Sequence, residues 1–264
     1  MVFPALTWVL LAVAAVICAL GFIRFVWFMS VGYGLSVAGL GLAILVIGLI
    51  RGDMTWALGL QCVLAVVYGC RLGLFLLIRE MKSAAYRKTL AAQTDKPVPL
   101  PVKIVMWLFM AVLYVCQVSP LWYREATAPQ AGIALSVVGA VIMLCGIVIE
   151  AVADRQKSAA KAVDPKKPAM TGLYKFSRCP NYFGEVVFWT GIFVSGLNVL
   201  TGWQWVIAVI GYICIVFIMV SGVKRLEKRQ NKNYADLPEY REYVKKTPVF
   251  VPFVPVYSLL GKKK

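Results

Sequence analysis

The fold is decided by residues 131–153, which read AGIALSVVGAVIMLCGIVIEAVA and hold Glu150 as their only charged side chain. About 20 consecutive apolar residues are enough to cross a bilayer as an α-helix. Similar apolar runs recur on both sides of this one. We therefore predict an all-α integral membrane protein with about seven transmembrane helices: Phe3–Trp27, Phe28–Ile50, Thr55–Ile78, Val102–Trp122, Ala131–Ala153, Tyr182–Leu200 and Gly202–Gly222.

The composition also indicates that lipid is the solvent of this chain. Hydrophobic residues make up 61% of the sequence and charged residues only 15%, yet the net charge is +16. The cations gather in Arg79–Lys103, in Asp154–Arg178 and after Gly222, whereas the alternate connections carry almost no net charge. Under the positive-inside rule, this pattern predicts an outside N-terminus and a cytoplasmic C-terminus. We expect a multi-pass protein of a bacterial inner membrane rather than of the endoplasmic reticulum.

The absence of histidine excludes many kinds of site. Ser-His-Asp triads, Cys-His pairs and HExxH zinc sites all need that residue. The seven cysteines lie mostly within apolar runs and show no CxxC spacing, so we predict small core residues, no disulfide framework and no metal site.

One candidate site lies where the fifth predicted helix leaves the membrane. Glu150, Asp154, Lys157 and Lys161 share one face at helical spacing. Two interpretations fit this pattern. The face is either an amphipathic helix end with i,i+4 salt bridges, or a rim that binds a ribose hydroxyl through carboxylate and a phosphate through lysine.

A second candidate is the segment GLYKFSRCPNYFGE, residues 172–185. Pro180 fits the first turn of a helix, and Asn181 and Glu185 then lie one turn apart. A carboxylate carried into a membrane helix is costly, so Glu185 should be paired or should face a polar cavity. The alternative is an interfacial aromatic belt with a capping asparagine.

Two further groups of residues combine charge with phenols. Tyr68 and Arg71 lie one turn apart inside the third predicted span, where an arginine needs a polar partner unless it snorkels. The tail after Gly222 interleaves cations with tyrosines. Such a tail either anchors to headgroups or stacks an adenine while its cations hold phosphates.

The residues at 177–185, SRCPNYFGE, closely resemble the CPNYFGE signature of the membrane steroid 5α-reductase family and its bacterial relatives. The order and spacing of the Glu150–Asp154 helix end, the Tyr68–Arg71 pair and the Tyr243–Pro252 tail are similar too. The resemblance covers most of the chain from about the third span onward.

This resemblance implies an NADPH-dependent enzyme that reduces a C=C bond conjugated to a ketone, most closely a 3-oxo-Δ4 steroid. We predict one domain over residues 1–264, because the sequence has no repeat or low-complexity tract and its tail after Lys224 is too short to hold a core of its own. Within this domain, the resemblance implies substrate-side helices in 1–101 and a cofactor-binding half in 102–264. Tyr68 would hydrogen-bond the substrate carbonyl, with Tyr33 as the other catalytic candidate. The cofactor-binding candidates are Arg71, Arg79, Glu150, Asp154, Lys157, Lys161, Tyr174, Arg178, Asn181, Tyr182, Glu185, Arg225 and Tyr234.

Within this set, Asp154 and Lys161 would hold the ribose and phosphate portion, and Glu185 would lie near the nicotinamide amide. The expected partners are a lipophilic, steroid-like enone and membrane lipids, with no nucleic acid, and we expect a monomer.

The sequence departs from the family at the substrate. Steroid-reducing members carry a glutamate in the second span as the partner of the tyrosine, and Phe28–Ile50 contains no acid. Tyr33, Ser30 and Ser36 are the notable polar residues there.

Two other functions compete with this one. An isoprenylcysteine-type methyltransferase would use S-adenosylmethionine, but its motif carries a histidine where this chain has Cys179. A transporter or lipid-binding scaffold would place broken helices and ionisable groups near the midplane, whereas here the polar residues gather at one membrane face.

Overall fold

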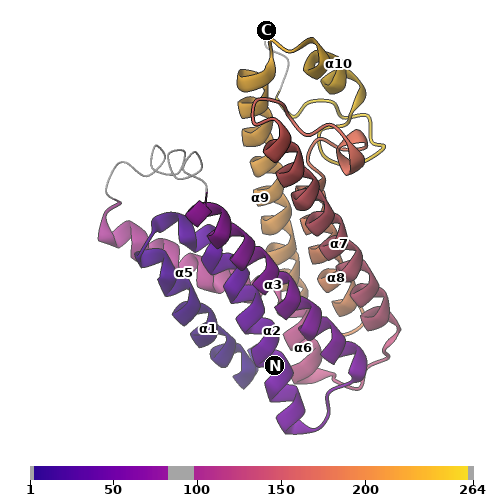
Figure 1. Ribbon diagram of the computed structural model, residues 1–264. Helices are drawn as coiled ribbons and strands as arrows, with labels where there is room; N and C mark the ends of the chain where they lie inside the picture. Colours follow the sequence, from indigo (N-terminus) through magenta and orange to yellow (C-terminus); the bar gives the residue numbers. More distant parts are fainter. Residues whose placement is uncertain (1–2, 83–97, 261–264) are drawn as a thin grey trace. The chain divides into compact units, whose positions relative to one another are not determined.

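The chain is a multi-pass membrane protein built from helices. The computed structural model describes residues 3–82 and 98–260, contains no strand in those ranges and is 78% helical (Figure 1). Six helices in the described ranges are long and apolar enough to cross a membrane. The elements are α1 (Ala5–Cys18), η1 (Ala19–Phe22), η2 (Phe25–Met29), α2 (Val31–Arg51), α3 (Trp56–Lys82), α5 (Leu100–Gln117), α6 (Ser119–Thr127), α7 (Ala134–Val163), η3 (Gly172–Lys175), α8 (Pro180–Gly196), α9 (Trp203–Tyr234) and α10 (Pro238–Lys246).

The connection between the first two membrane helices is longer than the hydropathy pattern predicted. α1 ends at Cys18, and two short 3₁₀ segments, η1 and η2, precede α2. Most residues of the connection are apolar, and Phe28 packs within it, fully buried and in edge contact with Phe22 at a ring-centroid distance of 5.6 Å. Apolar residues that fill a turn add to the hydropathy of both neighbouring spans, and the predicted boundary at Trp27 and Phe28 is therefore wrong.

The predicted span Val102–Trp122 is divided into two helices. α5 ends at Gln117, and α6 begins at Ser119 with Pro120 in its first turn. Proline lacks an N–H and restricts the residue before it, so a helix rarely continues through that position. Trp122 therefore belongs to α6, where its indole N–H donates to the carbonyl of Val115 at 3.1 Å.

Three helices of the C-terminal half also differ in length from the prediction. α7 and α9 continue past their predicted membrane ends, to Val163 and Tyr234. α8 has 17 residues, which makes it about 25 Å long at 1.5 Å per residue, and it is not one of the six candidate spans. The seven-span count and the orientation of the termini remain predictions. Arg87, Lys88 and Lys96 of the predicted basic connection lie outside the described residues.

The chain divides into two compact units, and each is described by itself. Unit 1 comprises Met1–Ala140 and Ile192–Tyr212, and unit 2 comprises Val141–Gly191 and Ile213–Lys264. The sequence analysis predicts one domain with functional halves at 1–101 and 102–264. Those halves are defined by their role, whereas the two units are defined by compactness, so the units do not test that prediction.

In unit 1, α2 and α3 pack at glycines. A Cβ on Gly69 would lie 2.3 Å from the carbonyl oxygen of Gly34 and 2.5 Å from the backbone nitrogen of Ala38. Real Cβ atoms essentially never approach so closely, so the two backbones touch where only glycine fits. Small residues at such contacts drive helix association in membranes, because they let the backbones approach.

We expect Gly69→Ala to separate α2 from α3 and to lower the free energy of unfolding by about 1–3 kcal/mol, as overpacking does. Gly59→Ala in the same helix is the control, because its nearest neighbour, the sulfur of Met54, would lie at an ordinary 3.6 Å. Equilibrium unfolding in detergent measures both variants. Equal stability of the two would contradict the close packing.

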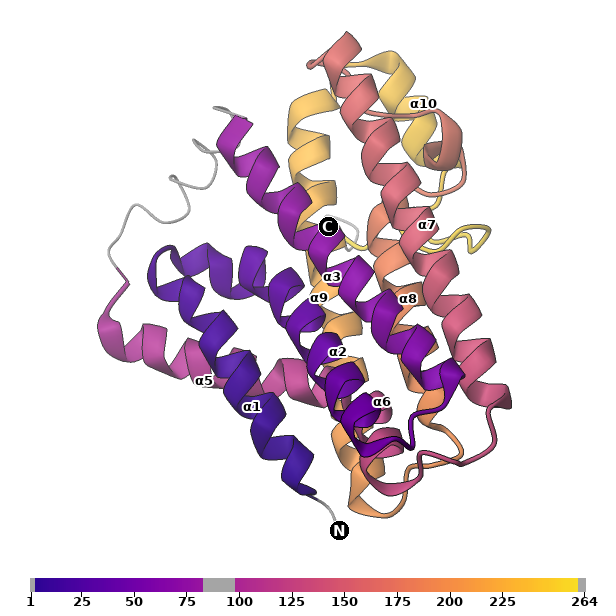
Figure 2. The same ribbon diagram turned by 60° about the horizontal axis from the view of Figure 1, so that its bottom comes forward.

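In unit 2, α7, α8 and α9 run side by side, as Figure 1 and Figure 2 both show. α7 and α8 meet at another glycine contact, where a Cβ on Gly146 would lie 2.4 Å from the backbone nitrogen of Phe188. At one end of these helices, residues 164–179, α10 and the chain after it form a cap. The cap contains the cofactor candidates Tyr174 and Arg178, and most of the other candidates lie on α7, α8 and α9.

Candidate functional site

Two tyrosines face each other across the α2–α3 contact of unit 1. The hydroxyls of Tyr33 and Tyr68 lie 3.4 Å apart, and the side chains are 6% and 0% exposed. Each tyrosine directly precedes a glycine of the contact, Gly34 or Gly69, so the close helix packing also brings the hydroxyls together. The structure thus places both predicted catalytic residues in one buried pair.

A third tyrosine supports this pair from α5. The ring of Tyr114 lies 5.3 Å from that of Tyr33, and its hydroxyl donates to the carbonyl of Phe28 at 2.5 Å. Phenol groups can donate a hydrogen bond to a carbonyl or to an oxyanion, and such a bond is stronger in apolar surroundings. The arrangement is suited to holding a carbonyl oxygen inside the bundle.

Arg71 and Arg79 follow Tyr68 along α3. Both are half-buried, and the guanidinium of Arg79 lies 5.6 Å from the centroid of the Phe75 ring. The next residue, Glu80, was not selected from the sequence. It is 4% exposed, pairs with Arg24 and accepts a hydrogen bond from the indole of Trp27 at 2.8 Å. The sequence signal that could have identified Glu80 is its place as an acidic residue at the end of an apolar run.

Three buried carboxylates mark the α7–α8 pair in unit 2. Glu150 and Asp154 on α7 are 3% and 8% exposed, and Glu185 on α8 is 8% exposed. A Cβ on Gly184, the neighbour of Glu185, would lie 2.7 Å from the backbone nitrogen of Glu150. The glycine contact therefore brings Glu150 and residue 184 to the same level of the two helices.

Asn181 presents an open acceptor in the first turn of α8. Its Oδ1 atom is buried and has no hydrogen-bond partner in the part of the chain that the structure describes. Glu185 follows one turn later. A buried carbonyl oxygen without a donor is costly, so this position is suited to a ligand that brings an N–H or O–H group.

Lys161 and Tyr234 lie together, although 73 residues separate them in the sequence. The ammonium of Lys161 donates to the Tyr234 hydroxyl at 2.6 Å and to the carbonyls of Lys167 at 2.6 Å and Pro165 at 2.9 Å. An ammonium has three protons, and these bonds use all of them. This geometry favours a role for Lys161 in shaping the loop after α7 over the predicted phosphate contact.

Three more cations act electrostatically on residues at the start of α8. The charge of Lys157 acts on the Cys179 thiol, whose pKa burial raises to about 12. The charges of Arg225 and Arg229, both exposed on α9, act on the hydroxyl of Tyr182. Positive charge is therefore concentrated near the start of α8.

Tyr174 and Tyr243 hold the loop before α8 in place. Tyr174 donates to the carbonyl of Ala153 at 3.3 Å, and its own carbonyl accepts from the hydroxyl of Tyr243 at 2.7 Å. Burial raises the pKa of both phenols above the ordinary value, and the charge of Asp154 adds to this effect at Tyr174. Both phenols stay neutral at physiological pH.

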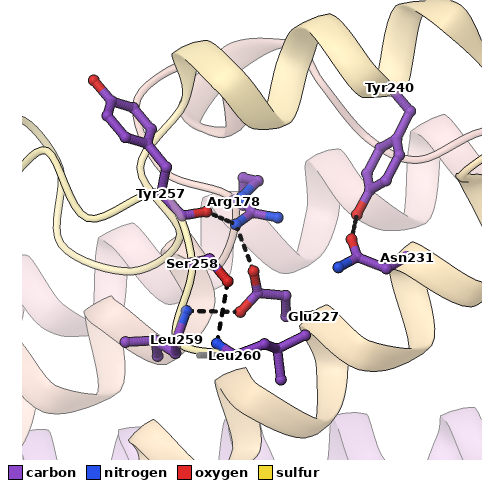
Figure 3. Close-up of polar contacts among 8 residues, drawn as sticks. All are labelled: Arg178, Glu227, Asn231, Tyr240, Tyr257, Ser258, Leu259 and Leu260. Carbon is purple, nitrogen blue, oxygen red and sulfur yellow. Dashed lines mark hydrogen bonds and ion pairs between the residues drawn. The ribbon is translucent and has the colours of Figure 1, made fainter. Parts of the chain in front are cut away.

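Arg178 lies in a buried ion pair with Glu227 of α9. Their nitrogen–oxygen distance is 3.0 Å, and both side chains are almost fully buried (Figure 3). The guanidinium also donates to the carbonyl of Tyr257, and the second Glu227 oxygen accepts from the backbone N–H of Leu259 at 3.0 Å. The pair ties the chain after α10 to α8 and α9. This structural role accounts for Arg178 more directly than the predicted cofactor contact does.

A second buried acid that sequence analysis missed lies on α6 in unit 1. Glu125 is 1% exposed, and neither carboxylate oxygen accepts a hydrogen bond from any described residue. Arg51 is its nearest cation at 3.8 Å. Burial, with the charge of Asp53, raises the pKa of Glu125 from 4.5 to about 7, and Arg51 opposes the rise.

This shift predicts a specific pH dependence of stability. Between pH 4.5 and about 7 the folded chain keeps a proton at Glu125 that the unfolded chain has released, so stability falls as the pH rises through that window. Above pH 7, Glu125→Gln should therefore be more stable than the parent by about 3 kcal/mol, because the parent must ionise a buried carboxyl and each pKa unit corresponds to about 1.4 kcal/mol. Thermal unfolding at pH 5 and pH 8 tests this, and a gain of the same size at both values would contradict it.

The predicted site residues thus form two groups. Tyr33, Tyr68, Arg71 and Arg79 belong to unit 1, and the candidates from Glu150 to Tyr234 belong to unit 2. Within each unit the structure brings members of the group together. Their union in one site remains a prediction.

Comparison with known proteins identifies a family without an assigned activity. The family model described as "Protein of unknown function (DUF1295)" matches residues 10–247, which is most of the chain. The searches of curated proteins and of solved structures give no significant match.

Proposed function

This chain belongs to the DUF1295 family, which is associated with membrane proteins resembling steroid 5α-reductases, and on that premise we propose that it is an NADPH-dependent ene-reductase. The proposed substrate is a lipophilic α,β-unsaturated ketone, most closely a 3-oxo-Δ4 steroid, which reaches the protein through the bilayer.

The buried Tyr33–Tyr68 pair is the observation that carries the proposal. Reduction of an enone breaks the C=C π bond, adds hydride at the β-carbon and a proton at the α-carbon, and passes through an enolate. Negative charge therefore develops on the carbonyl oxygen. A phenol donor aimed at that oxygen stabilises the enolate more than the ketone, which lowers the barrier.

The second hydroxyl offers a substitute for the acid that α2 lacks. Tyr33 occupies α2 and lies 3.4 Å from Tyr68, so it can orient the Tyr68 hydroxyl or donate to the same oxygen. Both side chains are buried, at 6% and 0% exposure, as contact with a sterol-like ring system requires.

The residues of unit 2 fit a dinucleotide in several respects. The unpartnered Oδ1 of Asn181 can accept from a carboxamide N–H, and the carboxylates of Asp154 and Glu185 can accept from ribose hydroxyls or from the same amide. Lys157, Arg225 and Arg229 supply positive charge for phosphates. NADPH, when bound, supplies the hydride; the residues named here bind and orient it.

Ligand-dependent thermal stability of the detergent-purified protein tests the proposal. A ligand that binds only the folded state stabilises it by about 2.7 kcal/mol at 100 times its Kd. We expect NADPH to raise the unfolding temperature, with NADH raising it less and S-adenosylmethionine leaving it unchanged. A rise in unfolding temperature with S-adenosylmethionine alone would contradict the reductase proposal and would favour the methyltransferase.

A further inference from the structure

The chain after α10 forms a tightly held loop, here called the C-terminal loop, residues 247–260. Two hydrogen bonds fix its first part. The backbone N–H of Arg178 donates to the carbonyl of Pro248 at 2.9 Å, and the hydroxyl of Ser177 donates to the carbonyl of Phe250 at 2.6 Å. The Arg178–Glu227 pair fixes its last part (Figure 3). Between them, the N–H of Val249 donates to the carbonyl of Val256 at 2.8 Å, which closes the loop on itself.

The surface of this ordered loop is apolar. Phe253 at its tip is 84% exposed, and Phe176 of the preceding loop, 50% exposed, packs beside it with ring centroids 5.8 Å apart. Four more loop residues are each 38–43% exposed: Val251, Val254, Val256 and Tyr257. Contiguous exposed apolar surface of this kind marks a contact with another phase or partner.

The backbone at the tip points to the same conclusion. Phe253 has a φ of +64°, and it is the only residue other than glycine with a positive φ in the described chain. A bulky side chain in this conformation is strained, and such strain is usually found where the surrounding structure holds it for a function. Here the strained residue is also the most exposed of the loop.

The position of the C-terminal loop along the helices of unit 2 indicates that lipid is its contact. Val249 is buried in a cluster with Cys179 and Val223, directly before α8 and at the end of the apolar run of α9. Cys179 and Val223 lie close to the predicted membrane ends at Tyr182 and Gly222, so hydropathy predicts that the loop lies near the boundary between hydrocarbon and headgroups. In both ribbon views the loop (yellow) lies closer to the middle of the unit 2 helices than α10 does.

The charges around the loop suit a lipid surface. Residues 247–260 contain no acid, and the exposed Lys175 and Lys224 adjoin Phe176 and Val223. Aromatic side chains flanked by lysine are typical of the membrane–water interface, where rings lie among headgroups and ammonium groups reach the phosphates.

We propose that the C-terminal loop is an interfacial membrane anchor, which inserts Phe253 and Phe176 into the leaflet at which α8 begins. The lipid replaces the water that would otherwise cover the apolar tip. The contact would hold the cap of unit 2 at the surface of the bilayer, independently of the activity proposed above.

Photo-crosslinking tests the anchor in native membranes. p-Benzoylphenylalanine replaces Phe253, and, as a matched control, the exposed Asp236 in the turn before α10. After irradiation, mass spectrometry of the purified protein is expected to show lipid adducts severalfold more abundant at 253 than at 236. Cross-links from 253 to a second copy of the chain or to another protein, or equal lipid adducts at both positions, would overturn the proposal.

A second measurement is independent of the photo-label. Phe253→Cys and Asp236→Cys are treated with a membrane-impermeant maleimide in lipid nanodiscs, with the parent protein giving the background of the native cysteines. We expect labelling at 253 to be severalfold slower than at 236. Equally fast labelling at the two positions would mean that the tip lies in water and would refute the anchor.

Discussion

Tyr68→Phe is expected to lower kcat for enone reduction by about 10²–10³-fold, the loss typical of removing one donor from a developing oxyanion. The ring stays in its packed position, so the thermal shift with NADPH should be retained. Turnover measured by cofactor oxidation, beside the thermal shift, separates chemistry from binding. Full kcat in this variant would show that Tyr68 is not the donor.

Matched variants distinguish the roles of the neighbouring phenols. Tyr33→Phe should reduce kcat less than Tyr68→Phe if Tyr33 orients the hydroxyl of Tyr68, and about equally if both donate to the substrate. Tyr114→Phe is the structural control, because its hydroxyl already donates to the carbonyl of Phe28. We expect it to lower stability and to leave most of kcat intact.

Glu227→Gln is expected to lower the free energy of unfolding by about 3–5 kcal/mol, because it leaves the buried guanidinium of Arg178 without its counter-charge. The change also weakens the bond to Leu259 and loosens the C-terminal loop. Equilibrium unfolding in detergent measures the loss. Hydrogen exchange at residues 247–260 should increase in the same variant.

The surface pair between Lys167 and Glu239 provides the control. Its nitrogen–oxygen distance of 2.9 Å matches that of the buried pair, but both side chains are exposed. Solvent screens such pairs, so Glu239→Gln should cause no measurable loss. A large loss in this variant, or none in Glu227→Gln, would contradict the assignment of the stabilising role to the buried pair.

Much of the fold follows from hydropathy along the chain. The long apolar runs became α2, α3, α5, α7 and α9, since a backbone in lipid must satisfy its hydrogen bonds internally. Hydropathy alone did not separate the apolar turn at Phe28 from its neighbouring helices. It also did not predict the helix break at Pro120, because proline interrupts backbone hydrogen bonding without making the segment more polar.

The site was predictable in composition but not in geometry. The SRCPNYFGE motif and the spacing of Glu150 and Asp154 identified residues that the structure places on adjoining helices of unit 2. Two contacts join residues that are far apart in the sequence: the bond between Lys161 and Tyr234, and the ion pair between Arg178 and Glu227. No local sequence pattern predicts such contacts. They showed that three predicted cofactor ligands, Lys161, Tyr234 and Arg178, already have protein partners.

The glycine contact between α2 and α3 also bears on how the protein is made. Only residues 52–55 connect these helices, so they form a hairpin that is complete once the first 82 residues have been synthesised. Tyr33 and Tyr68 both belong to this hairpin. We therefore expect the phenol pair to assemble during insertion into the membrane, before translation of α7, α8 and α9 begins.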